Sequence, residues 1–211
     1  MRALAVTPIH LPDDEVARRQ ARYDRLAPPG VEIELRNVGP TAPATLDTAA
    51  SMRDSEREVA ALLKDAGEGF DLAFPDCVLD PSVPDAVTEP ALPVHGILKL
   101  SATHLAGKGV RFGAVVRNEA IKDEFAKRIS AYGLDEYLAG IRVLDLPFSA
   151  IAETEVWNAA LGSAVRELAE LGATAVINGC SAVDVEPADL PTRIVDPTEL
   201  AMRLLAVEGE R

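Results

Sequence analysis

Two short apolar segments, each followed by a cysteine, constrain the fold of this chain more than any other feature. Ala173–Asn178 is followed two residues later by Cys180, and an equivalent stretch ends at Cys77. Each cysteine lies eight residues after a glycine, Gly69 or Gly172, and the chain has no other cysteine. Apolar runs of this length predict buried strands. Both thiols are therefore expected at strand ends.

The order of predicted elements before each cysteine repeats. Hydrophobic patterning predicts strand, helix, strand, helix and strand in each half. These elements fall at 2–6, 11–26, 31–35, 46–66 and 70–77, and again at 110–116, 119–130, 141–146, 151–171 and 173–178. Alternating strands and helices give parallel sheets with helices on both faces. We therefore expect an α/β fold with two similar Rossmann-like (flavodoxin-like) lobes and a cleft between them.

Further elements are expected between and after the two repeats. Asp80 followed by Pro81 is typical of a helix start, with Asp80 as the N-cap. A short strand or turn is expected at 92–96, a helix at 97–105, a strand at 194–195 and a closing helix at 197–207. The alternating segment 31–35 is typical of an edge strand. Ligands of open parallel sheets bind beyond the carboxyl ends of the strands, where both cysteines lie.

The charge balance limits the classes of partner. The 211-residue chain has a formal net charge of −13, which argues against a nucleic-acid or anionic-membrane surface. An anionic small molecule stays compatible, because a few local cations suffice to bind it. No apolar run approaches the roughly 18 residues of a membrane span. The N-terminus reaches Thr7 and Pro8 before a signal-peptide core forms. We therefore expect a cytoplasmic protein with reduced thiols and no membrane contact.

The sequence carries no recognisable motif for a cofactor or a metal. The glycine-rich segment 107–113 precedes a predicted strand instead of following one, so it predicts a turn rather than a dinucleotide loop. There is no P-loop, no Gly-x-Ser-x-Gly elbow and no Cys-x-x-Cys. His10, His95 and His104 lack metal-ligand spacing, although His10 follows the first strand closely enough to reach the cleft. We expect neither a metal nor a cofactor.

At the two cysteine strands the sequence resembles the aspartate/glutamate/hydantoin racemase superfamily, and most of all its hydantoin and allantoin racemase branch. In the first half the resemblance is carried by Asp71, Cys77–Pro81 and Pro93–Ile97. In the second half it is carried by Arg111–Val116, Tyr132–Leu134, Ile141–Arg142, Gly172–Ala173, Asn178–Cys180 and Val195–Pro197. The likeness runs in order along nearly the whole chain.

The resemblance implies two pseudo-symmetric lobes, with the last helix returning to the first lobe. The first lobe would comprise residues 1–96 and 196–211, and the second residues 97–195. The resemblance also implies cofactor-free proton transfer, with Cys77 and Cys180 as the acid/base pair on opposite faces of the substrate. Two such groups invert a carbon acid without moving the substrate when one starts as thiolate and the other as thiol.

The segments that follow the cysteines have an expected part in this chemistry. A helix start after each cysteine would lower the thiol pKa and favour the thiolate. The backbone N–H groups of Val78, Leu79, Ser181 and Ala182 would receive the developing enolate oxygen. The nearby aspartates are expected to have mainly structural roles. Asp80 is expected to be an N-cap. Asp76 and Asp184 are expected to be surface or capping residues, with a supporting role near the thiols as the alternative.

The sequence departs from the family's usual pattern at three places that we expect beside the cleft. Thr7-Pro8-Ile9-His10 stands in place of Asn-Pro-Asn-Thr, Arg117-Asn118 in place of a threonine, and Ser82 in place of a glycine. An arginine at a strand end can bind a carboxylate bidentately, so an Arg117 that faces the cleft predicts an anionic substrate rather than a neutral hydantoin. The alternative is a solvated loop arginine. The candidates for further substrate contacts are Thr7, Pro8, His10 and Asn118.

Three functions are compatible with these observations. The first is a racemase or epimerase acting beside a carbonyl of a hydantoin-, allantoin- or amino-acid-like substrate. The second is maleate-type cis–trans isomerisation or arylmalonate-type decarboxylation, although the decarboxylase pattern keeps only the second cysteine. The third is a non-catalytic module that binds a small molecule. In each case we expect a small-molecule ligand and a homo-oligomer.

Overall fold

Two α/β halves follow one another along the chain in the computed structural model, which describes residues 1–66, 69–83, 92–186 and 189–209. The first half contains β1 (Arg2–Val6), α1 (Asp13–Leu26), β2 (Glu32–Arg36), α2 (Ala49–Lys64) and β3 (Leu72–Pro75). The second contains β4 (Phe112–Val116), α4 (Glu119–Ala131), β5 (Leu138–Val143), α5 (Thr154–Glu170) and β6 (Ala175–Asn178). Helix α3 (Ile97–Gly107) joins the halves, and β7 (Arg193–Val195) and α6 (Pro197–Gly209) follow β6.

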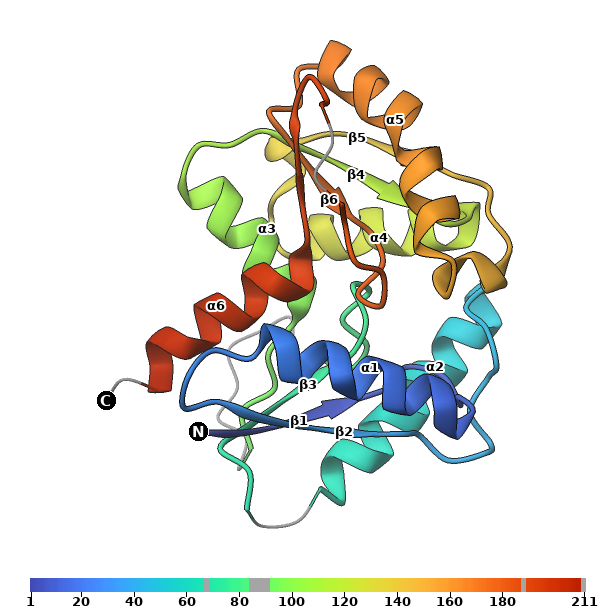
Figure 1. Ribbon diagram of the computed structural model, residues 1–211, viewed down its shortest axis with the longest axis vertical. Helices are drawn as coiled ribbons and strands as arrows, with labels where there is room; N and C mark the ends of the chain where they lie inside the picture. The colour runs from blue at the N-terminus through green and yellow to red at the C-terminus, as the bar shows by residue number, and fades with distance from the viewer. Residues whose placement is uncertain (67–68, 84–91, 187–188, 210–211) are drawn as a thin grey trace.

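The described strands form two separate parallel sheets, one in each half. Their orders are β2-β1-β3 and β5-β4-β6-β7, so β1 and β4 hold equivalent places beside the strand that leads to a cysteine. Strand β2 lies at an edge and alternates in burial, as expected. Figure 1 shows the two sheets as separate layers, one above the other, with helices around each. The predicted fold of two α/β lobes is confirmed.

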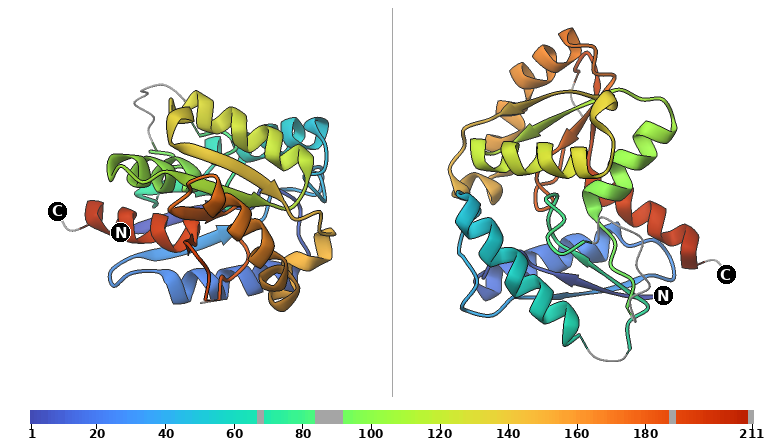
Figure 2. Two further views of the ribbon diagram at one scale, coloured as in Figure 1. Left: turned by 90° about the horizontal axis from the view of Figure 1, so that it is seen from above. Right: turned by 180° about the vertical axis from the view of Figure 1, so that it is seen from behind.

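Successive residues of a strand point to opposite faces of its sheet, and this alternation decides which helix covers which face. In the first sheet, Ala3 shares a hydrophobic cluster with Tyr23 of α1 and Met202 of α6. Leu4, its neighbour, shares another cluster with Val59 of α2. Helices α1 and α6 therefore cover one face and α2 the other, and the views in Figure 2 show α1 and α2 on opposite sides of the strands.

The second sheet is covered in the same way. Val115 shares a cluster with Trp157 of α5. Ala114, on the opposite face, shares one with Phe125 of α4 and Leu98 of α3. The cluster that contains α3 and α4 also takes in residues of the first half, so it crosses the boundary between the two sheets. The two lobes are thus held together by continuous apolar packing.

Some elements differ from those predicted. The strand expected at 141–146 lies three residues earlier, at Leu138–Val143, and Phe148–Ile151 forms a separate 3-10 helix before α5. The segment expected at 92–96 contributes one isolated parallel bridge, from Val94 to Ala73. Across the described part of the chain, no helix is both long enough and apolar enough to cross a bilayer.

The prediction of a helix that begins at Pro81 is wrong for the residues that the structure describes there. Asp80 and Ser82 take positive φ angles of 49° and 64°, and the segment around Pro81 forms a turn. Any continuation of that expected helix into 84–91 lies outside the described residues. The Asp-Pro pair therefore signals a tight turn here, because Asp tolerates the left-handed region better than most residues.

Candidate active site

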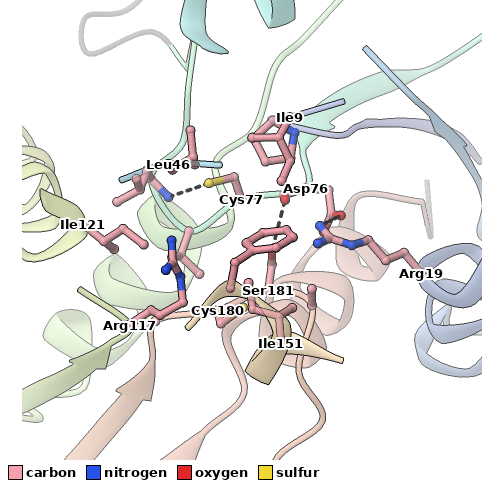
Figure 3. Close-up of a pocket in the computed structure, with 16 residues that line it drawn as sticks. Ile9, Arg19, Leu46, Asp76, Cys77, Arg117, Ile121, Ile151, Cys180 and Ser181 are labelled. Carbon is pink, nitrogen blue, oxygen red and sulfur yellow. Dashed lines mark hydrogen bonds and ion pairs between the residues drawn. The ribbon is translucent and has the colours of Figure 1, made fainter. Parts of the chain in front are cut away.

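Both cysteines line one cavity, of about 60 Å³, between the two sheets. The loop after β3 supplies Cys77 and the loop after β6 supplies Cys180, so the thiols enter from different lobes. Figure 3 shows Arg117 and Arg19 at opposite ends of this cavity. Apolar side chains from both lobes also line it, namely Ile9, Leu46, Leu79, Ile121, Phe148 and Ile151.

The two cysteine loops leave their sheets by equivalent hydrogen bonds. The backbone N–H of Asp76 donates to the Val6 carbonyl at 2.7 Å, and that of Gly179 donates to the Val115 carbonyl at 2.7 Å. Gly179 has no room for a side chain, because an added Cβ would lie 2.3 Å from the Val115 oxygen. The residue after each of these contacts is the cysteine, so the two thiols occupy equivalent positions at the ends of their sheets.

Turns, rather than helices, follow both cysteines within the described residues, so the expected helix dipole is wrong as the source of thiolate stabilisation. The stabilising donor is local. The backbone N–H of Leu79 donates to Cys77 Sγ at 3.4 Å, and that of Ala182 bonds to Cys180. Burial outweighs these donors: it raises the pKa of Cys77 to about 12 and also raises the pKa of Cys180.

The four backbone N–H groups that were expected to stabilise an enolate oxygen fall into two pairs with different partners. Leu79 and Ala182 direct their N–H groups to the sulfur atoms. Among the described residues, no acceptor lies within hydrogen-bond distance of the N–H groups of Val78 or Ser181, and both residues line the cavity. These two unpaired N–H groups, one from each lobe, are candidate donors to an oxygen of a bound molecule.

Asp76 lies at the centre of a buried polar network, not at the surface. Its carboxylate accepts from Arg19 Nη1 at 2.9 Å and from the Tyr23 hydroxyl at 2.7 Å, both on α1. Its backbone carbonyl accepts from the Ser181 hydroxyl at 3.0 Å, which ties the two cysteine loops together. Asp76 and Arg19 both line the cavity. The surface or capping role expected for Asp76 is therefore wrong.

Arg117 lines the cavity from the end of β4, and its side chain is only 7% exposed. Its Nη2 forms an ion pair with Asp47, a half-exposed carboxylate just before α2. Its guanidinium also lies over the Phe148 ring, 5.8 Å from the ring centroid. Arg117 Nε is buried and has no hydrogen-bond partner among the described residues. One donor of Arg117 is thus unsatisfied, whereas Nη1 donates to the Leu146 carbonyl and Nη2 to Asp47.

Several residues expected to contact the substrate are held by other partners, outside the cavity lining. The Thr7 hydroxyl is fully buried and joins Asn37 at 3.0 Å. The exposed His10 places Nδ1 3.1 Å from the Val38 carbonyl oxygen. Asn118 is the N-cap of α4, and its amide also donates to Asp47. Of the residues expected from the sequence, those that do line the cavity are Pro8, Cys77, Val78, Leu79, Arg117, Cys180, Ser181 and Ala182.

Asp80 and Asp184 also have structural partners. The Asp80 carboxylate accepts from the backbone N–H groups of Leu98 and Lys99, so it caps α3 rather than the helix expected directly after it. The Tyr132 hydroxyl donates to the same carboxylate. Burial raises the pKa of Asp80 to about 6. Asp184 is half exposed and pairs with arginines of α1.

A short internal repeat marks the arginines and tyrosines that sequence reasoning missed. The segments 15–23 and 124–132 carry Glu, Arg and Tyr at their first, fifth and ninth positions. These spacings put the three side chains on one face of a helix. In both segments the glutamate pairs with the arginine one turn later, and the tyrosine donates to an aspartate of the Cys77 loop. The described residues contain no cluster suited to a metal ion.

Comparisons with known proteins agree with this architecture. A family model described as Asp/Glu/Hydantoin racemase matches residues 16–205. The chain therefore belongs to the Asp/Glu/hydantoin racemase family, which places it among the isomerases. This confirms the resemblance in the sequence. Comparison with curated proteins gives no match.

Solved structures of the same fold include two allantoin racemases. The enzyme from Pseudomonas fluorescens superposes with a TM-score of 0.82 at 16% identity, over 99% of this chain and 92% of that chain. The enzyme from Klebsiella pneumoniae gives 0.75 at 19% identity, over 99% and 89%. A mutant of arylmalonate decarboxylase gives 0.56 at 16% identity, over 100% and 95%. At these identities the likeness establishes the fold.

Proposed function

We propose that the chain is a cofactor-independent racemase or epimerase in which Cys77 and Cys180 form the acid/base pair. The observation that carries the proposal is that two thiols, one from each lobe, line a single small cavity. One thiolate removes the proton beside a carbonyl, and the opposite thiol delivers a proton to the other face. The carbon is thereby inverted without rotation of the substrate.

The negative charge that forms during this step needs stabilisation. Proton removal beside a carbonyl places the charge on the carbonyl oxygen, and backbone donors held in advance lower the energy of that enolate. The N–H groups of Val78 and Ser181 supply such donors from the two lobes. The apolar lining keeps the site at low effective dielectric, which strengthens these contacts. The same lining raises the pKa of both thiols, so proton abstraction is favoured by alkaline pH.

We further propose that the substrate carries a carboxylate, which binds Arg117. A buried guanidinium that lines the end of the cavity and has one unsatisfied N–H suits a planar anion. Because the same cation also suits a dianion, maleate-type cis–trans isomerisation is the second candidate. Hydantoins and allantoin lack a carboxylate, so this proposal favours acidic amino acids or related carbon acids as substrates.

The test is a substrate panel assayed with single cysteine variants. Hydantoins, allantoin, acidic amino acids, maleate and an arylmalonate are incubated with the protein, and products are resolved by chiral chromatography. Cys77→Ser and Cys180→Ser should each reduce turnover by about 100-fold or more, because a serine hydroxyl replaces an essential acid or base. His10→Ala is the control and should retain activity, since His10 lies outside the cavity lining. Full activity in either cysteine variant would contradict the proposal.

A further inference from the structure

Helix α1 of the first half lies against the cysteine loop of the second half. Arg18 Nη2 donates to the carbonyl of Ala182 at 3.1 Å, and Arg22 Nη2 donates to that of Val183 at 3.3 Å. Figure 1 shows this loop, which follows β6, reaching down from the upper sheet to α1. The positive face of α1 is therefore presented to Cys180 across the boundary between the lobes.

Arg19, between those two arginines, reaches the cavity itself. It is buried and is held by Glu15 and Asp76, each 2.9 Å away. Burial raises the pKa of Cys180, while Arg19 and Arg22 act to lower that pKa and Asp76 acts to raise it. Other charged groups nearby are Arg18, which bonds to the Ala182 carbonyl, and Asp184 and Asp196, which both accept from Arg22. Two cations thus partly offset the effect of burial on the pKa of Cys180.

Cys77 has more acidic neighbours than Cys180. Burial raises the pKa of Cys77 to about 12, and the charges of Asp76 and Asp80 act in the same direction. The arginine that corresponds to Arg19 in the repeat is Arg128 of α4. Its guanidinium pairs with two carboxylates, Glu56 at 3.1 Å and Glu124 at 3.3 Å. Arg19 and Arg128 are therefore paired alike. The two thiols differ instead in the aspartates of the Cys77 loop and in the α1 arginines that bond to the Cys180 loop.

We propose that Cys180 ionises before Cys77, so that Cys180 supplies the thiolate and Cys77 the thiol of the active form, and that Arg19 is the positioning residue that sets this polarity. The assignment rests on the proposed two-thiol function. In the forward step the Cys180 thiolate takes the carbon-bound proton, and the Cys77 thiol transfers its proton to the opposite face of the carbanion. The enzyme is then left with a Cys77 thiolate and a Cys180 thiol, and proton exchange with solvent restores the form with a Cys180 thiolate.

Site-resolved alkylation tests the polarity without any substrate. The protein is treated with iodoacetamide across a range of pH, and mass spectrometry gives the modification rate of each cysteine. The plateau rate reports access to the thiol, whereas the pH of the midpoint reports its ionisation, because the thiolate is the reactive form. The midpoint for Cys180 should lie below that for Cys77. A Cys77 midpoint equal to or below that of Cys180 would overturn the assignment.

Variants of the repeated arginines test the part played by Arg19. Arg19→Gln should raise the Cys180 midpoint by about one pH unit, because a nearby cation is removed, and Arg19→Lys should restore most of the shift. Arg128→Gln, at the matched position of the repeat, should leave the Cys180 midpoint in place. An unchanged Cys180 midpoint in Arg19→Gln would refute the role of Arg19. If that variant does not fold, Arg19→Lys and the order of midpoints in the unaltered protein decide the question.

Because no turnover is measured, this result and the racemase assay can fail independently. The predicted order of midpoints without activity on any carbon acid would leave the polarity intact and count against the proposed function. Racemisation with the reverse order would retain the function and overturn the polarity.

Discussion

At the scale of single residues, Arg117 distinguishes this cavity from the pattern that the family usually shows. The threonine that is usual at this position carries no charge, whereas Arg117 places a guanidinium in the lining of the cavity that also contains the thiols. We predict that Arg117→Thr raises KM for a carboxylate substrate about 10- to 100-fold, the effect expected when a hydrogen bond to a charged group is lost. Neutral substrates should be affected less. Steady-state kinetics on both substrate types measure the difference.

Arg142 provides the control for this substitution. Arg142 lies in the same sheet, on β5, where it is the register partner of Val115 on β4. Its side chain forms an ion pair with Glu167 of α5. Arg142→Thr should therefore leave KM unchanged for every substrate. Equal losses on charged and neutral substrates in Arg117→Thr would show that Arg117 supports the fold of the cavity instead of binding the carboxylate.

At the scale of elements, Asp80 joins the Cys77 loop to the start of α3. Burial raises the pKa of this carboxyl from 3.8 to about 6, so the folded state holds its proton more tightly than the unfolded chain. Stability should therefore fall as pH rises from about 4 to about 6, on the order of 3 kcal/mol in total, and level off above that. Urea titrations at several pH values measure the slope.

Asp80→Asn should remove this pH-dependent component while retaining an acceptor for the end of α3. Other carboxyls contribute to the stability profile, so the difference between the two proteins is the relevant quantity. An identical slope in both proteins between pH 4 and 6 would show that Asp80 titrates normally.

The same carboxylate restricts the residue at position 96 to glycine, because a Cβ added to Gly96 would lie 2.3 Å from the Asp80 carboxylate.

At the scale of the whole molecule, the elements that sequence patterns predicted are those with local causes. The strand–helix order before Cys77 and Cys180 follows from hydrophobic periodicity, and it fixes the parallel sheets and both thiol positions. The contacts that were missed join distant segments: Arg19 meets Asp76 from 57 residues away, and Arg117 meets Asp47 from 70. An arginine on a helix usually faces solvent, so only the tertiary fold shows that Arg19 is buried.

The expectation of a helix after each cysteine failed for a related reason. Asp-Pro and small polar residues signal turns and helix starts alike, and the choice depends on what packs nearby. Here Asp80 turns inward to cap α3, which begins 17 residues later in the chain. The nine-residue repeat in α1 and α4 was the available signal for the buried arginines and tyrosines, because its spacing places them on one helix face.

The measurement that tests the two-thiol account most directly is solvent deuterium incorporation during the initial phase of turnover of a single enantiomer. If Cys77 and Cys180 act on opposite faces, the product formed in D₂O carries deuterium at the inverted carbon, while the remaining substrate keeps its proton. Mass spectrometry after chiral separation gives both values. Product that retains the original proton, or substrate that exchanges as fast as product forms, would contradict the account.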